Sequence, residues 1–176
     1  MLPDPRILIL FGTNVLLLQL TLLVGSASVP WLPYPVLLGP MIVLAPLYLR
    51  WSGFFACAVL TGLWVDAALP SPFGLFTVLF PCLGTAFHQA RIRFRASGNT
   101  HPALLAHLAN FVCVLALTAT AAGPVFAHAA VWIHVLGTLA LSHLALLAVA
   151  PWFFNLQRCL FVLCRTEIEP EELPRL

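Results

Sequence analysis

The chain has 176 residues, a length typical of one domain, and hydrophobic residues make up 61% of it, whereas soluble domains contain about 45–50%. Only 8 basic and 6 acidic residues carry a formal charge, although a water-soluble surface needs about a quarter to a third of charged residues. The 62 residues between Arg95 and Arg158 contain none. The composition therefore excludes a soluble enzyme, a nucleic-acid-binding protein and a disordered chain, and it predicts an all-α integral membrane protein.

Long apolar runs divide the chain, and a helix needs about 20 such residues to cross the hydrocarbon of a bilayer. We expect a six-helix transmembrane bundle over residues 1–165. Its crossings are predicted at about 7–27, 33–49, 53–69, 73–89, 102–122 and 128–150. A further helix at 152–165 either extends the last crossing into the cytoplasm or lies in the membrane interface. Residues 166–176 form an acidic cytoplasmic tail.

The second run is the weakest, because it is short and contains Pro40 and Pro46. It either begins earlier, near Trp31, or is kinked and partly re-entrant. All eight basic residues are Arg, and cytoplasmic loops collect positive charge. With six crossings and a cytoplasmic N-terminus every Arg falls on the inner side, whereas five crossings would place Arg50 outside. The arginines therefore favour six crossings with both termini in the cytoplasm.

Asp66 is the only acidic residue between Asp4 and Glu167, and an ionisable residue inside a membrane is a candidate for function. Ala58 and Gly62 precede it at four-residue spacing, which places a groove of small residues on the same helix face. One interpretation is a packing or partner site with a carboxylate at its outer end. The other is that Asp66 accepts hydrogen bonds from backbone N–H groups of the following turn or of the next helix's first turn.

Asn14, Gln19 and Asn110 are expected to form hydrogen bonds between helices. Arg91, Arg93 and Arg95 form a basic cytoplasmic loop, which we interpret first as a determinant of orientation at an anionic leaflet. Contact with a cytoplasmic partner is the second interpretation of this loop.

The histidines do not predict a metal site. His128, His134 and His143 are spaced by six and nine residues, which spreads them around one helix. The sequence contains no His-x3-His pair, and it shows no nucleophile–base arrangement of the kind used by hydrolases. We therefore expect no metal, no cofactor and no enzymatic activity.

The segment that contains Asp66 resembles the bacterial rod-shape-determining MreD family. The resemblance consists of Gly62, Asp66 four residues later, a short Ser- and Pro-containing turn that ends at Pro72, and the pair Phe73-Gly74 that opens the next helix. An apolar helix and a basic loop follow, so that the match covers roughly a fifth of the chain.

The resemblance implies a non-catalytic scaffold subunit of the cell-elongation complex, which synthesises peptidoglycan in rod-shaped bacteria. The implied location is the bacterial cytoplasmic membrane, and the implied fold is similar to the substrate-binding components of vitamin transporters. The implied partners are an MreC-like single-span protein, the elongation transpeptidase with its SEDS glycosyltransferase, and MreB filaments. Ala58, Gly62, Asp66 and the Pro72-Phe73-Gly74 turn would shape the face that docks the partner's membrane helix.

A second hypothesis is a small-molecule-binding component of a membrane transporter. It predicts an outward-facing pocket near Trp31, Tyr34, Asp66 and His128, and specific stabilisation by a vitamin would support it.

Overall fold

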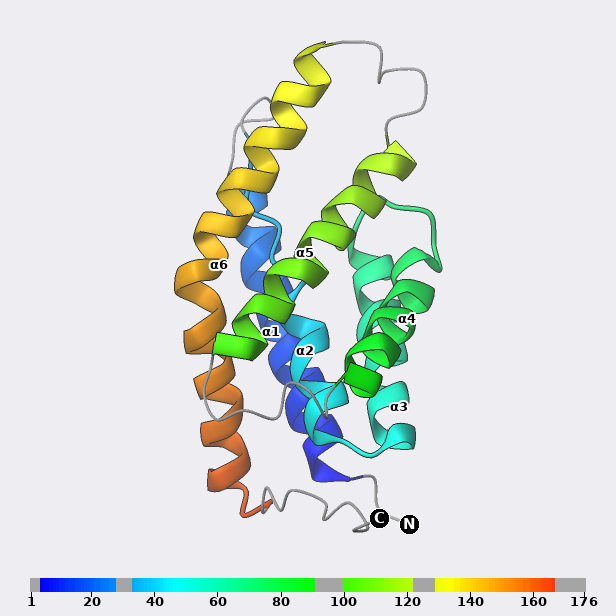
Figure 1. Ribbon diagram of the computed structural model, residues 1–176, viewed down its shortest axis with the longest axis vertical. Coiled ribbons are helices and arrows are strands. Elements are labelled where there is room, and N and C mark those ends of the chain that lie inside the picture. Colours follow the sequence, from blue (N-terminus) through cyan, green and yellow to red (C-terminus); the bar gives the residue numbers. More distant parts are fainter. Residues whose placement is uncertain (1–3, 28–32, 91–99, 122–128, 167–176) are drawn as a thin grey trace.

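The computed structural model describes residues 4–27, 33–90, 100–121 and 129–166, and within them every regular element is an α-helix. The helices follow in chain order as α1 (Pro5–Ala27), α2 (Pro40–Tyr48), α3 (Trp51–Ala68), α4 (Leu75–Ala90), α5 (Thr100–Ala121) and α6 (Ala129–Leu163) (Figure 1). By length and hydropathy, α1, α3, α5 and α6 can each cross a membrane. The chain is therefore a multi-pass membrane protein, and the predicted all-α class is confirmed.

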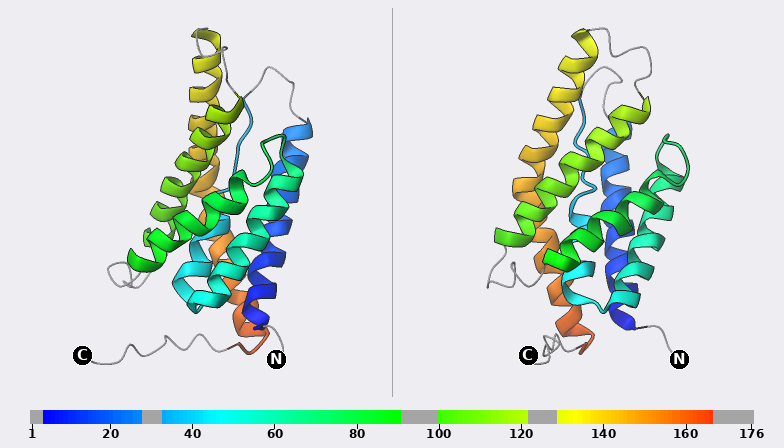
Figure 2. Two further views of the ribbon diagram at one scale, coloured as in Figure 1. Left: turned by 90° about the vertical axis from the view of Figure 1, so that its right-hand side faces the viewer. Right: turned by 45° about the vertical axis from the view of Figure 1, so that its right-hand side comes forward.

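The shortest helix lies at the centre of the bundle. α2 packs against all five other helices, and its residues from Pro40 to Pro46 are all buried. The first turn of α1, the link between α2 and α3, and the last turn of α6 lie at the same end of the bundle (Figures 1 and 2). The other helices therefore surround α2.

The predicted second crossing is helical only in its second half. Its helix begins at Pro40, not near Trp31, and residues 33–38 have no regular secondary structure. Pro33 and Pro35 explain this, because each removes a backbone N–H and disfavours a helical conformation in the residue before it. Extended chain rises about 3.3 Å per residue against 1.5 Å in a helix. The second run would be too short to cross about 30 Å of hydrocarbon as a continuous helix, but its extended first half makes it long enough.

Side chains of α5 and α6 satisfy the backbone of this extended segment. Asn110 Oδ1 accepts hydrogen bonds from the N–H groups of Leu38 (3.0 Å) and Gly39 (3.1 Å), and Ser142 Oγ accepts one from Val36 (2.9 Å). Gly39 also lies so close to Asn110 that an added Cβ would sit 2.8 Å from the Asn110 backbone nitrogen. Non-helical backbone is tolerated at membrane depth where it is buried in protein and hydrogen-bonded there.

α6 passes without a break through Pro151 and ends at Leu163. Of the two interpretations of the predicted helix at 152–165, the structure shows the extension of the last crossing. At 1.5 Å per residue, the 35 residues of α6 measure about 52 Å, which exceeds the hydrocarbon thickness of about 30 Å. α6 is therefore longer than one crossing requires.

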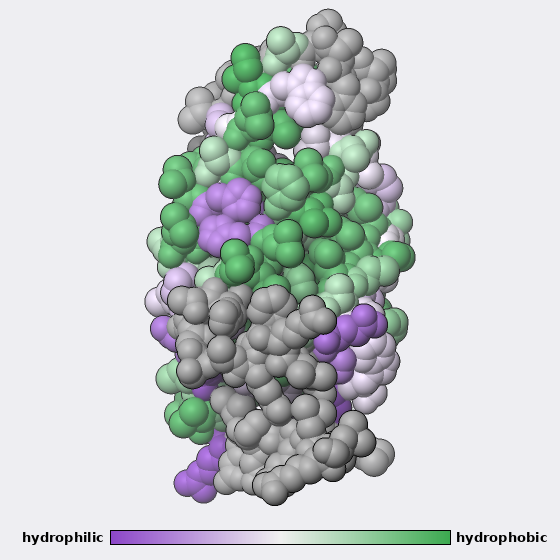
Figure 3. All heavy atoms as spheres, viewed as in Figure 1, coloured by the Kyte–Doolittle hydropathy of each residue, from purple (hydrophilic) through white to green (hydrophobic). Residues whose placement is uncertain are grey.

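The visible surface of the upper bundle is mostly apolar, with one hydrophilic patch on its left, and further hydrophilic residues lie in the lower half (Figure 3). Arg6 at the start of α1, Arg50 before α3 and Arg165 after α6 belong to the segments that meet at that end. Arg91, Arg93, Arg95 and Arg175 lie outside the described residues.

Asn110→Leu is expected to lower the free energy of unfolding by about 1–3 kcal/mol, because two buried N–H groups lose this acceptor. Ser142→Ala removes the acceptor of one N–H and is expected to cost less. Unfolding by SDS in mixed micelles, followed by circular dichroism, measures both effects.

Thr120→Val is the control, because the Thr120 hydroxyl is exposed and bonds to Leu117 O within its own helix. Unfolding of Asn110→Leu at the same SDS fraction as this control would contradict the role of Asn110.

Candidate functional site

Asp66 lies near the end of α3 and is only 4% exposed. Its Oδ2 atom accepts hydrogen bonds from the Gly74 N–H (3.0 Å), the Thr77 N–H (2.9 Å) and the Thr77 hydroxyl (2.6 Å). Its Oδ1 atom accepts one from the Phe76 N–H (2.8 Å). These donors open α4, where backbone N–H groups lack helical partners and negative charge is favoured. Asp66 thus caps the next helix, as the hydrogen-bonding interpretation predicts.

Gly74 is required by the same turn. Its φ of 100° lies in the left-handed region, which residues with a side chain rarely adopt. This conformation carries the Gly74 N–H to Asp66 just before α4 begins at Leu75. The Asp and the Gly of the resemblance therefore act in one local structure.

The small-residue groove of α3 is occupied by α4 of the same chain. Ala58 and Gly62 are buried, and a Cβ on Gly62 would lie 2.5 Å from Phe76 O and 2.8 Å from Thr77 Cα. The groove is therefore not open to another helix. In the predicted set, Pro72 and Phe73 remain exposed, Phe73 at 72%.

Thr77 contributes two of the four bonds to Asp66 and was not among the predicted site residues. Its position in the first turn of the helix after Asp66 is the available signal, because hydroxyl groups near helix starts often take part in capping. The basic loop Arg91, Arg93 and Arg95 lies outside the described residues.

A buried polar cluster joins four helices in the half of the bundle that contains α2. Asn14 Nδ2 donates to Met41 O (2.9 Å) and to Thr61 Oγ1 (3.2 Å). Gln157 Nε2 donates to Thr13 Oγ1 (2.8 Å) and to Asn14 Oδ1 (3.4 Å). Asn14, like Asn110 above, bonds between chain segments as predicted.

Gln19 does not form the predicted bond to another helix of the described chain. Its side chain is exposed on α1, and no described residue forms a hydrogen bond with it. Gly12, Leu16 and Leu23 are exposed on the same helix face, and a Cβ on Gly12 would meet nothing within 4 Å. We refer to Gly12, Leu16, Gln19 and Leu23 as the α1 stripe.

Three histidines make contacts between helices that spacing along one helix did not predict. His107 Nδ1 and His143 Nδ1 lie 2.8 Å apart and link α5 to α6. His88 Nδ1 lies 2.9 Å from Pro46 O and donates to it, since a carbonyl oxygen only accepts. No group of three or more His, Cys, Asp or Glu side chains able to hold a metal occurs in the described part of the chain.

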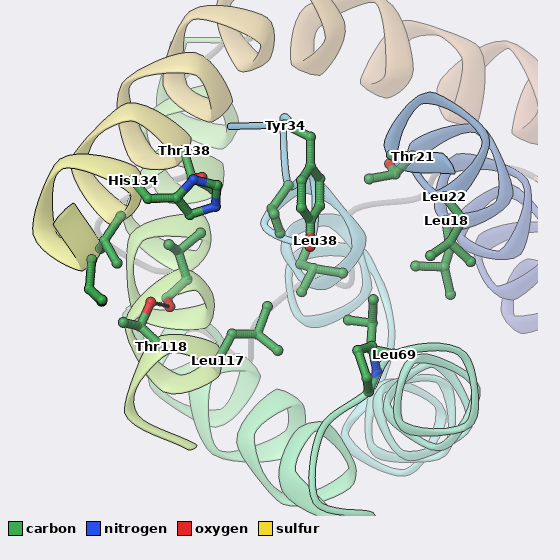
Figure 4. Close-up of a pocket in the computed structure, with 16 residues that line it drawn as sticks. Leu18, Thr21, Leu22, Tyr34, Leu38, Leu69, Leu117, Thr118, His134 and Thr138 are labelled. Atoms are coloured by element: carbon green, nitrogen blue, oxygen red, sulfur yellow. Dashed lines mark hydrogen bonds between the residues drawn. The ribbon is translucent and has the colours of Figure 1, made fainter. Parts of the chain in front are cut away.

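A cavity of about 630 Å³ opens between α1, the extended segment, α5, α6 and the end of α3 (Figure 4). Tyr34 of the predicted pocket lines it, together with His134. Asp66 does not, because it caps α4. Trp31 and His128 lie outside the described residues. No charged side chain is among the residues that line the cavity.

Three features are therefore candidates for function: the turn capped by Asp66, the α1 stripe and the cavity. Comparison of the chain with protein-family models, curated proteins and solved structures finds no match.

Asp66→Ala is expected to lower the free energy of unfolding by about 1–3 kcal/mol, because buried N–H groups of α4 lose their acceptor. Asp66→Asn retains one carbonyl oxygen and is expected to be milder. Thermal unfolding in detergent measures both. Asp4→Asn is the matched control, since Asp4 Oδ1 also accepts a backbone N–H bond, from Arg6 at 3.0 Å, but is exposed. If both Asp66 variants unfold at the same temperature as the wild type, the capping role is excluded.

Proposed function

We propose that the chain is a non-catalytic scaffold subunit of the bacterial cell-elongation complex, similar to the MreD family. Its place is the bacterial cytoplasmic membrane, where it would dock the transmembrane helix of an MreC-like single-span protein. Gly62, Asp66 and Gly74, which carry the resemblance, support the proposal because they form one hydrogen-bonded turn where α4 packs against α3. A rigid turn of this kind holds a bundle in one shape, which a scaffold requires.

The observation that carries the docking proposal is the exposed amide of Gln19. Gln19 lies fourteen residues beyond Pro5 in α1, which is about 21 Å along the helix. At this depth hydrocarbon surrounds the side chain, and an amide without a partner there costs several kcal/mol. A hydrogen bond from a neighbouring helix removes this cost.

The shape of the α1 stripe favours a helix as the occupant. Gly12 lies two turns before Gln19 on the same face and has open space where its Cβ would be. Small residues let two membrane helices approach closely, and polar side chains then bond across the contact. We infer that a single-span partner helix with a hydrogen-bonding side chain covers this stripe, in place of the α3 groove that α4 fills.

The remaining partners are assigned to other surfaces of the chain. Phe73 at the exposed α3–α4 turn is the contact proposed for the transpeptidase and its SEDS glycosyltransferase. Arg91, Arg93 and Arg95 are proposed to face the cytoplasm, where MreB filaments lie.

We further propose six crossings with both termini in the cytoplasm. The four long helices would account for four crossings. α4 would be the fifth, and the extended segment together with α2 would be the sixth. The meeting of Arg6, Arg50 and Arg165 at one end of the bundle supports this orientation, because positive charge collects on the cytoplasmic side.

The transporter hypothesis is supported only by the cavity beside Tyr34. Recognition of a vitamin requires several polar groups that converge on the ligand, whereas leucine and valine dominate this lining and Asp66 is bonded elsewhere. The cavity therefore favours an apolar ligand, and we retain the scaffold as the proposed function.

Gln19→Leu is expected to reduce capture of a co-expressed MreC-like protein about three- to twentyfold, since hydrogen bonds between membrane helices contribute about 0.6–1.7 kcal/mol. Gly12→Leu is expected to reduce it further by preventing close approach. Co-purification from detergent, quantified by mass spectrometry, measures both effects.

Ala140→Leu is the matched control for Gly12→Leu, because it adds similar bulk at an exposed position of α6. Capture that is equal in Gly12→Leu, Gln19→Leu and this control would remove α1 as the docking helix.

The orientation is tested with reporters. A reporter fused after Arg175 is expected in the cytoplasm, and one inserted at Pro124 is expected outside, since α5 and α6 flank that position. Reporters on one and the same side would contradict six crossings.

A further inference from the structure

The cavity lies in the half of the bundle that is farther from Arg6, Arg50 and Arg165. Its walls come from the second half of α1 (Leu18 to Gly25), the second half of α5 (Val114 to Thr118) and the first part of α6 (Val131 to Thr138). Val36 and Leu38 of the extended segment line it from within the bundle. In the proposed six-crossing arrangement these segments belong to the outer half of the membrane, which would place the cavity level with lipid chains.

Two of the five polar side chains in this lining are already hydrogen-bonded within the protein. The Thr21 hydroxyl donates to Leu17 O at 2.9 Å and the Thr118 hydroxyl to Val114 O at 2.7 Å. Each bond lies within its own helix, α1 or α5. The other side chains that line the cavity from these two helices are leucines and a valine. An apolar cavity of this kind does not hold water well.

One group of polar atoms remains without partners. The Thr138 side chain is 9% exposed, and its hydroxyl has no hydrogen-bond partner among the described residues. His134 lies one turn before it on α6, and the Tyr34 side chain extends into the cavity between α1 and α6 (Figure 4). No described residue forms a hydrogen bond with the Tyr34 hydroxyl or the His134 ring. Donors and acceptors are thus concentrated on one side of an otherwise apolar space.

We propose that this cavity binds a single-chain neutral lipid, whose hydrocarbon chain fills the apolar part and whose hydroxyl-bearing head bonds to Tyr34 and His134. The volume of about 630 Å³ is within the range of about 300–1,000 Å³ of known small-molecule sites. The absence of charged residues from the lining selects an uncharged head. The inference is independent of partner docking, because the α1 stripe shares no residue with the cavity lining.

The probe is 1-monooleoylglycerol with a photoactivatable diazirine in its acyl chain, applied to the full-length protein in nanodiscs of dioleoylphosphatidylcholine, which contain no single-chain neutral amphiphile. Mass spectrometry then locates the labelled residues. Labels are expected on the walls in α1, α5 and α6, and excess unlabelled monooleoylglycerol is expected to suppress them while labels at lipid-facing Leu144 and Leu147 persist. Equal suppression at both places, or labels on the lipid-facing residues alone, would overturn the proposal.

Val135→Trp fills the cavity and is expected to lower wall labelling roughly fivefold or more, because a packed site has no room for the added ring and a chain together. Leu136→Trp is the matched control, since Leu136 follows it in α6 and is 61% exposed to lipid. Equal labelling of the two variants would overturn the proposal. The competition experiment uses the wild type, so its result does not depend on how either variant folds.

Two further ligands test the chemistry of the head. Oleoyl lysophosphatidylglycerol is expected to compete roughly tenfold less well, since no cation in the lining offsets the desolvation of its phosphate. Equal competition would overturn the assignment of a neutral head. Suppression of wall labelling by riboflavin or thiamine at lower concentrations than monooleoylglycerol requires would overturn the lipid assignment and favour a transporter component.

Discussion

A backbone amide inside hydrocarbon needs a partner from the protein itself, because no water is present to replace it. A continuous helix meets this requirement within its own segment, but the extended segment before α2 does not. Prolines remove some of its donors, and Asn110 and Ser142 accept hydrogen bonds from three of the others. At the far end of α2, His88 donates to Pro46 O. α5, α6 and α4 are thus tied to the second crossing through its backbone.

The same requirement explains why Asp66 is tolerated. Isolated in lipid, a carboxylate is costly, but the first turn of α4 presents N–H groups that lack helical partners. Each of the two elements supplies what the other lacks, and Gly62 allows them to approach. The motif that resembles MreD therefore stabilises the fold directly. In the proposed scaffold its contribution to partner binding would come through the shape of the bundle, while α1 would present the exposed amide of Gln19.

The all-α class, most helix positions and the hydrogen bonds of Asp66 follow from local pattern, since apolar length, small-residue spacing and a lone carboxylate are local signals. The extended half of the second crossing is different. Pro33 and Pro35 signal that a helix is interrupted, but hydropathy alone does not tell extended chain from helix. Placing this segment requires Asn110 and Ser142, which lie more than 70 residues away in the chain.

The side chains that sequence reasoning misplaced depend on how helices face one another. Gln19 and Asn14 lie on one helix and are similar in chemistry, yet Asn14 is 1% exposed and Gln19 faces outward. The rotation of α1 decides between the two, and packing against α2 and α3 sets that rotation. His107 and His143 meet for a similar reason, because the crossing of α5 and α6 brings them together.

The position of the cavity follows from the broken crossing. A helix with its side chains is about 10–12 Å wide, whereas an extended chain occupies about 5 Å in the direction of a neighbouring strand. Where α2 is helical the bundle is filled, and Met41 to Ala45 are at most 3% exposed. Where the same crossing is extended, at Tyr34, Val36 and Leu38, the surrounding helices are not drawn together and the cavity opens. A lipid chain is narrower than the missing half of this helix but shares its apolar character, so it would fill part of the space that the prolines leave open.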